Sequence, residues 1–267
     1  MLVEARNISL DVPDMGHHVL FGQRRKLRIL NDVSITIDRG ETVGIVGESG
    51  SGKTSLGRTL LRLYEPSEGT LTFAGTDITH MPQSALKPLR RRMQMIFQDP
   101  QSSLNPRLQI GTILGRGLNL HGLDASEKTL SALVDRVGLP RSVLNRYPHQ
   151  LSGGQRQRVG IARAIALKPD FVVADEIVSG LDVSTQAQVL DLLKGLRAEF
   201  GLSLAFISHD LSVIRHICDR IVIMRGGEIV EAGNTAETFR APKTEFTKTL
   251  IAAIPLPEPD KTWLTSS

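Results

Sequence analysis

The sequence predicts an α/β fold in which helices cover a mostly parallel β-sheet. An apolar run at 42–46, a glycine-rich loop at 47–54 and an amphipathic stretch at 55–63 form a strand, a loop and a helix in succession. Strand and helix patterns alternate again after Ser152, whereas residues 99–150 show helical patterns and no convincing strand. We therefore expect a helical insertion in a domain whose ligands bind at the C-terminal ends of the strands.

The N-terminal part of the chain, residues 1–46, is expected to form strands. Apolar and polar side chains alternate over 33–37, and a turn follows at 38–40. The segment 13–26 is polar and basic, which predicts a loop. The later elements expected in this half are a turn at 66–69, a short strand at 70–75, and a buried strand at 94–97 that ends at Gln98.

The C-terminal half is expected to alternate helices and apolar strands. Ser126 is placed to cap a helix over 127–137, and another helix opens near Ser152. Further on, the patterns predict strands at 171–174 and 204–207, helices at 184–200 and after Asp210, and a hairpin over 221–231.

Composition and charge give no sign of a nucleic-acid partner. The 267 residues are 40% hydrophobic and 22% charged, as in ordinary soluble proteins, and the net charge is +4. Basic residues cluster at 24–28 and 87–92, but aromatic residues make up only 4% of the chain and none interleaves with these clusters. We interpret the clusters as solvated faces and expect no nucleic acid among the partners.

Cysteine usage indicates a reducing compartment. The hydropathy pattern indicates that any membrane role depends on a partner. Cys218 is the only cysteine, which excludes a disulfide within the chain. The first residues include Glu4 and Arg6 and show no apolar signal core. No uninterrupted apolar stretch approaches the roughly 20 residues that span a bilayer.

The loop at 47–54 has the complete spacing G-x-x-x-x-G-K-T of a phosphate-binding loop. Its glycines let backbone N–H groups point inward, where the following helix N-terminus adds partial positive charge. Lys53 supplies a charge for the β- and γ-phosphates, and the Thr54 hydroxyl is placed for Mg²⁺. A dinucleotide fingerprint starting at Gly50 fails because Ser55 stands where glycine is needed. The expected nucleotide-binding residues are Gly47, Glu48, Ser49, Gly50, Ser51, Gly52, Lys53, Thr54 and Ser55.

Two adjacent carboxylates close the apolar strand at 171–174. Asp175 is placed to hold Mg²⁺ from the strand end, and Glu176 to polarise the water that attacks the γ-phosphorus. The pattern alone also fits a pair of solvated acids at the start of a loop.

A second anion cradle follows at residues 151–155, which read LSGGQ. A capped helix start with exposed N–H groups binds anions, and one nucleotide does not need two such sites. Here the chain resembles the ATP-binding cassette (ABC) ATPases, over about residues 2–253. The resemblance implies two cassettes in head-to-tail contact, with the segment Ser152, Gly153, Gly154 and Gln155 of each capping the γ-phosphate of the other. It also implies a RecA-like P-loop NTPase core with an N-terminal antiparallel β part and a helical signature subdomain.

Further positions match the family's motifs. Gln98 corresponds to the Q-loop glutamine, which contacts Mg²⁺ and relays to the membrane subunit. Residues 179–182, ending in Asp182, correspond to the D-loop, and His209 corresponds to the histidine that contacts the γ-phosphate. The resemblance therefore implies Glu176, His209 and Lys53 as catalytic residues, and Thr54, Gln98 and Asp175 as ligands of Mg²⁺.

The chain departs from the family pattern at three places. Val12 stands where the family often stacks an aromatic ring on adenine, so Phe21, or less plausibly His17 or His18, is the expected substitute. Ile177 replaces a usual proline, and Gly180 replaces a frequent alanine. Neither of the last two changes removes a charged group, so we expect slow but real ATP hydrolysis.

Four segments narrow the resemblance to the cassettes of peptide and nickel importers: residues 97–100, 103–107, 147–151 and 246–255. This branch implies oligopeptides or dipeptides as cargo, with nickel, a metal chelate or another small solute as alternatives. It also implies ATP and Mg²⁺ as cofactors and a peripheral place on the cytoplasmic face of the cell membrane. The implied partners are two transmembrane permease subunits, a second and paralogous ATPase that makes a heterodimer, and a periplasmic or extracellular solute-binding protein.

The same resemblance divides the chain into three parts. Residues 1–97 and 156–239 form the nucleotide-binding core with its β subdomain, residues 98–155 form the helical signature subdomain, and residues 240–267 form a C-terminal tail. Three rival functions are weaker. Soluble ABC ATPases that act on nucleic acid or the ribosome carry a second cassette, a coiled coil or a zinc module, and this sequence shows none of these. A non-catalytic cassette conflicts with the intact Lys53 and Glu176. In a P-loop kinase, residues 151–155 would have no purpose.

Overall fold

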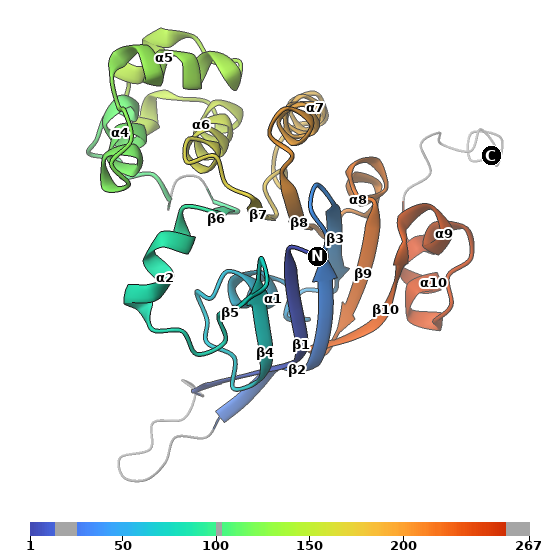
Figure 1. Cartoon of the computed structure of the whole chain (residues 1–267). Coiled ribbons are helices and arrows are strands. Elements are labelled where there is room, and N and C mark those ends of the chain that lie inside the picture. Colours follow the sequence, from blue (N-terminus) through green and yellow to red (C-terminus); the bar gives the residue numbers. More distant parts are fainter. Residues whose placement is uncertain (14–25, 100–102, 255–267) are drawn as a thin grey trace, which may run out of the picture.

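The computed structural model describes residues 1–13, 26–99 and 103–254, and these contain two β-sheets (Figure 1). The main sheet has six strands in the order β10-β9-β3-β8-β7-β6, and the second has four in the order β2-β1-β4-β5. The strands of the main sheet are β3 (Thr42–Gly47), β6 (Met93–Ile96), β7 (Phe171–Asp175), β8 (Ser203–Ile207), β9 (Arg220–Arg225) and β10 (Glu228–Asn234).

The main sheet is parallel from β9 to β6, and β10 alone runs antiparallel, as the second strand of a hairpin with β9. Its strands are short and apolar because both faces are covered. Along β7, Phe171 and Val173 pack into one core cluster while Val172 and Ala174 pack into the other. Successive side chains of a strand point to opposite faces, so a strand buried on both sides has no polar position to alternate with.

Helices cover the two faces of this sheet. Helix α1 (Lys53–Leu60) follows β3 and packs with the N-terminal sheet on one face, where Leu56 and Leu60 join the smaller cluster. On the other face lie α6 (Gly153–Ile165), α7 (Val183–Phe200) and α8 (Leu211–Ile217), which contribute buried residues to the larger cluster. The remaining helical segments are α2 (Gln83–Arg90), α4 (Ile110–Leu120), α5 (Glu127–Arg136), α9 (Thr235–Arg240), α10 (Glu245–Ala252), and the short 3₁₀ helices η1 (Arg141–Asn145) and η2 (Pro148–Gln150).

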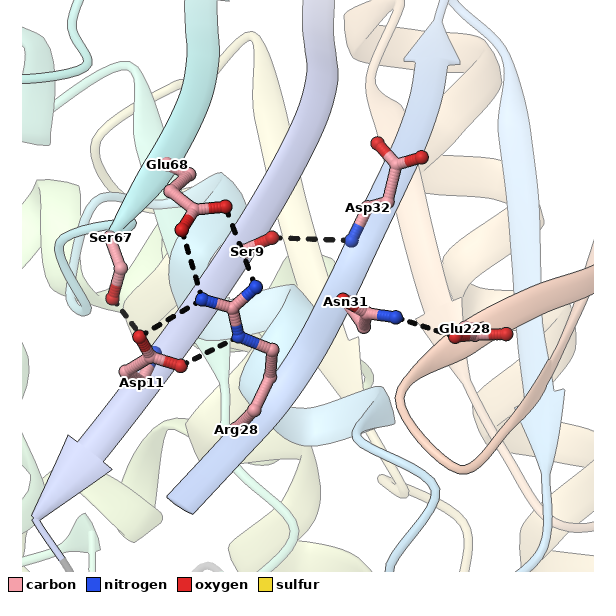
Figure 2. A network of polar contacts seen from close by, with 8 residues as sticks. All are labelled: Ser9, Asp11, Arg28, Asn31, Asp32, Ser67, Glu68 and Glu228. Atoms are coloured by element: carbon pink, nitrogen blue, oxygen red, sulfur yellow. Dashed lines mark hydrogen bonds and ion pairs between the residues drawn. The ribbon is translucent and has the colours of Figure 1, made fainter. Parts of the chain in front are cut away.

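The N-terminal sheet is antiparallel and consists of β1 (Val3–Pro13), β2 (Lys26–Ile37), β4 (Glu68–Phe73) and β5 (Thr76–Asp77). An ion-pair clamp joins three of these strands (Figure 2). Arg28 of β2 donates to Asp11 of β1 from Nε at 2.8 Å and to Glu68 of β4 from Nη2 at 3.0 Å. The clamp holds the ends of the three strands in register.

The predicted order of strands and helices is confirmed, including the antiparallel β part, the turn at 38–40 and the hairpin near the C-terminus. Within the described parts of 99–150, the chain forms helices and no strand, as expected, and α4, α5 and α6 gather beside the sheet (Figure 1). The loop expected at 13–26 falls almost entirely outside the described residues. The proposed division into three parts stays a prediction.

The sequence analysis assigned no helix to residues 83–90, 235–240 or 245–252, where α2, α9 and α10 lie. Helix α10 belongs to the segment expected to be a tail, but Phe246, Leu250 and Ile251 pack against the larger core cluster. The apolar face of this amphipathic helix therefore packs against the core. In the part of the chain that the structure describes, no helix is both long and apolar enough to cross a membrane.

Candidate functional site

The glycine-rich loop connects the end of β3 to the first turn of α1, as predicted. Gly47 has φ +151°, and a Cβ atom at this position would lie 2.1 Å from the backbone oxygen of Met224. Only glycine allows the loop to leave the strand so close to β9. Gly52 then occupies the N-cap of α1, which leaves the first N–H groups of the helix free of side-chain caps and open to an anion.

Lys53 is buried under this loop, with only 6% of its surface exposed. Its ammonium donates to the carbonyl oxygens of Gly47 at 2.8 Å and Glu48 at 2.7 Å. Burial lowers the pKa of the Lys53 ammonium, and the charges of Glu176 and Asp175 oppose this shift. The ammonium is thus held by two neutral acceptors that a phosphate group can outcompete.

Ser51 gives an independent sign that the loop fits phosphate. Its Oγ is buried and has no hydrogen-bond partner among the residues that the structure describes. A buried hydroxyl without a partner is unfavourable by roughly 1–3 kcal/mol, so a ligand oxygen that accepts from it gains affinity. The loop therefore offers an unpaired hydroxyl, a buried ammonium and a helix N-terminus to the same anion.

Thr54 and Asp175 lie side by side where the loop meets β7. The Thr54 hydroxyl donates to Asp175 Oδ1 at 3.0 Å, and Asp175 is only 2% exposed. Burial raises the pKa of the Asp175 carboxyl, while the hydrogen bond from Thr54 acts in the opposite direction.

These two oxygen donors fit Mg²⁺. The described residues contain no group of three or more His, Cys, Asp or Glu side chains arranged to hold a metal. Proteins commonly bind Mg²⁺ through one or two oxygen ligands together with the phosphates of the nucleotide, and Thr54 with Asp175 supplies such a pair. Their role as metal ligands stays a prediction.

Glu176, which follows β7, contacts residues that follow the neighbouring strands β6 and β8. Its Oε2 accepts a hydrogen bond of 2.9 Å from Gln98 Nε2, beyond β6, and lies 3.4 Å from Nδ1 of His209, beyond β8. Its N–H donates to Ile207 at 3.0 Å, and its φ of +47° is unusual for a residue with a side chain. Backbone strain of this kind is retained where the surrounding structure fixes a side chain for a purpose. The structure thus brings Gln98 to Glu176, and the expected contact of Gln98 with Mg²⁺ stays a prediction.

The residues of the LSGGQ segment form a second group with Asp182. The Ser152 hydroxyl accepts from the Gln155 N–H at 3.2 Å, and the Gln155 side chain accepts from the Ser152 N–H at 3.0 Å, which makes a capping box at the start of α6. Asp182 caps α7 by accepting from the N–H of Thr185 at 2.9 Å. Hydrogen bonds from Ser184 and Thr185 hold the pKa of the Asp182 carboxyl well below its ordinary value.

The starts of α6 and α7 are packed together. A Cβ atom on Gly154 would lie 2.6 Å from Cγ2 of Thr185. Ser152, Gly153 and Asp182 remain exposed, so their polar groups face outward from the cassette. These exposed groups could contact a ligand bound to a second cassette, as the resemblance implies. That contact stays a prediction.

The residue that stacks on adenine also stays a prediction. Phe21, His17 and His18 lie outside the described residues. Val12 pairs with Leu27 in the N-terminal sheet and packs partly buried against the smaller core cluster.

The sequence analysis missed a bridge that supports the phosphate-binding loop. The N–H of Gly227 donates to the carbonyl of Ser51 at 3.1 Å, and the carbonyl of Gly227 accepts from the N–H of Asn31 at 2.9 Å. The Asn31 side chain donates to Glu228 at 2.6 Å (Figure 2). The glycine pair in the hairpin turn was the available signal in the sequence. It indicated a turn, but it did not indicate that the turn contacts Ser51.

Comparison with known proteins agrees with this geometry. Residues 30–179 match a protein-family model described as ABC transporter. The chain belongs to the ABC transporter family. The family and the fold that the sequence predicted are therefore confirmed, and with them a cassette that binds ATP.

Individual relatives place the chain more closely. It is 48% identical over 257 residues to the oligopeptide transport ATP-binding protein OppF of Bacillus subtilis, which covers 94% of this chain and 84% of that one. It is 45% identical over 262 residues to OppF of Streptococcus mutans, covering 97% and 83%. Among solved structures, the dimeric ATP-binding cassette MJ0796 bound to ADP and Pi superposes with a TM-score of 0.78 at 29% identity, covering 88% and 99%.

Proposed function

We propose that this ABC protein is the ATP-hydrolysing subunit of an importer that takes up oligopeptides or dipeptides. The observation that carries the proposal is the convergence of Lys53, Thr54, Asp175 and Glu176 below a phosphate-binding loop. Two relatives at 45% and 48% identity are named oligopeptide transport ATP-binding proteins, which supports peptide as the cargo.

In the proposed reaction, the β- and γ-phosphates lie along the loop, where the Lys53 ammonium exchanges the carbonyls of Gly47 and Glu48 for phosphate oxygens. Mg²⁺ bound at Thr54 and Asp175 would neutralise charge on the phosphates. The Glu176 carboxylate orients the attacking water and accepts its proton. His209, on the other side of Glu176, donates to the γ-phosphate and stabilises the negative charge of the transition state.

A second cassette completes the site in this proposal. The exposed helix start at Ser152 to Gln155 caps the γ-phosphate bound to the opposite cassette, and ADP lacks that phosphate. ATP and ADP therefore differ in affinity for the closed pair, and only such a difference shifts the equilibrium between open and closed states. Gln98 bonds to Glu176 and passes closure to the channel.

The proposed assembly pairs this chain with a second, paralogous ATPase under two transmembrane permease subunits, at the cytoplasmic face of the membrane. A solute-binding protein outside the membrane delivers the cargo. The names of the relatives favour peptide over nickel or a metal chelate.

The catalytic assignment is tested by Glu176→Gln, which keeps hydrogen-bonding capacity but removes the base. We expect the ATPase rate of the paired cassettes to fall at least about 100-fold and the ATP-bound dimer to persist in size-exclusion chromatography. Glu127→Gln, an exposed change in the first turn of α5, is the control and leaves the rate unchanged. Brisk turnover by Glu176→Gln would reject the role.

The cargo is tested by capturing the tagged chain with its partners from crosslinked membranes. Two permeases, a second ATPase and a solute-binding protein are expected in the mass spectrum. The solute-binding protein is then screened with di- and oligopeptides and with Ni²⁺, and binding of Ni²⁺ alone would replace peptide with metal as the cargo. Recovery of ribosomal or DNA-repair proteins without a channel would overturn the transport proposal.

A further inference from the structure

A cavity separate from the nucleotide site lies among α8, α9 and α10. Its volume is about 760 Å³, within the range of roughly 300–1,000 Å³ typical of small-molecule sites. These three helices group beside β9 and β10, on the opposite side of the molecule from α4 and α5 (Figure 1). The lining residues that matter for its chemistry are Arg215, Phe239, Arg240, Ile251 and Ile254.

One part of the cavity wall is apolar. Phe239, Ile251 and Ile254 are partly buried and pack against the larger core cluster. Each therefore leaves apolar surface facing the cavity on a rigid support. Covering such surface with an apolar ligand removes it from water, which is favourable.

Another part of the wall carries positive charge that no carboxylate of the described residues neutralises. Within the described residues, neither Arg215 nor Arg240 has a carboxylate in ion-pair contact; Arg215 instead lies over the ring of Phe239 at 5.8 Å. The one carboxylate of the wall, Asp219, is engaged by Arg197 at 2.6 Å and by the Thr42 N–H at 2.8 Å.

We infer that this cavity binds a small amphipathic carboxylate. The carboxylate group lies between Arg215 and Arg240, and the apolar body covers Phe239 and Ile251. Guanidinium groups match the planar geometry of a carboxylate and form strong charge-assisted hydrogen bonds with it. A cation would meet two arginines, and a purely apolar ligand would leave both guanidinium groups without an anionic partner.

The first test compares two probes of equal chain length on the unaltered full-length chain. Octanoate carries the carboxylate, and octanamide replaces it with a neutral group. Calorimetric titration is expected to show octanoate binding at least about tenfold more tightly, because only the carboxylate forms charge-assisted hydrogen bonds with the guanidinium groups. NMR shifts of the backbone N–H groups of α9 locate the site. Equal affinities, or octanoate shifts confined to other elements, would overturn the inference.

The second test uses variants of the cavity wall. Arg215→Gln and Arg240→Gln are each expected to weaken octanoate binding about tenfold and to leave octanamide binding unchanged. Arg116→Gln, at an exposed position on α4, removes the same charge elsewhere and is the control. Thermal unfolding shows whether each variant folds. Wild-type octanoate affinity in both folded arginine variants would reject the site, and the probe comparison decides the matter if a variant does not fold.

Discussion

Replacing Gly227 with alanine is expected to weaken nucleotide binding from a position outside the phosphate-binding loop. Gly227 lies in the turn between β9 and β10, where its N–H holds the carbonyl of Ser51 and its own carbonyl is held by Asn31. The turn thus links this part of β2 to Ser51 through two backbone hydrogen bonds. Displacing the turn removes support from the loop that carries Lys53.

The structure sets the size of the effect. Gly227 has φ +87°, and an added Cβ atom would lie 2.5 Å from the carbonyl oxygen of Ile29. A non-glycine residue in left-handed backbone costs roughly 1–2 kcal/mol, and relieving the contact adds roughly 1–3 kcal/mol. Its neighbour Gly226 has φ +56° but open space around the same atom, so Gly226→Ala carries only the first cost.

The pair of variants separates backbone strain from displacement of the turn. In urea unfolding, Gly227→Ala is expected to lose about 1–3 kcal/mol more stability than Gly226→Ala. Titration with a fluorescent ATP analogue is expected to show a Kd raised about three- to tenfold for Gly227→Ala, the equivalent of one net hydrogen bond, and little change for Gly226→Ala. Equal unfolding free energies and equal affinities in the two variants would refute the role of the bridge.

Two further predictions rest on single side chains. Ser152→Ala and Ser126→Ala each remove a helix cap and are expected to lower the free energy of unfolding by about 0.5–2 kcal/mol. Only Ser152→Ala should also slow the ATPase of the paired cassettes. Equal slowing by both variants would count against the proposed role of Ser152. The hydrogen bond from Arg28 holds the pKa of Asp11 below its ordinary 3.8, so the stability that this pair adds is present above pH 3.8 and is lost as the pH falls through the lowered value. Arg28→Gln should return the Asp11 pKa toward 3.8 in a ¹³C NMR titration and cancel that loss, and an unchanged Asp11 titration would contradict the clamp.

The sequence predicted best those features that depend on neighbouring residues. The apolar runs of β3, β7 and β8 and the motif around Lys53 are local patterns, and the structure has each in its expected place. Helix α2 was missed because Leu86 is its only buried residue and Pro88 interrupts its pattern. The bridge from β2 to the hairpin turn was beyond sequence reasoning, since the Asn31 side chain binds a residue 197 positions away.

The arrangement of the site follows from the order of the strands. β6, β7 and β8 are neighbours in the sheet, so Gln98, Glu176 and His209, which follow them, meet at one edge although they are far apart in the sequence. One oxygen of Glu176 accepts from Gln98 and also lies 3.4 Å from His209. Gln98 precedes the helical region and His209 precedes α8, so a shift of either element relative to the sheet changes the surroundings of the same carboxylate oxygen. Since a general base acts only when its oxygen faces the water, we expect a shift of either element to change the activity of the proposed catalytic group.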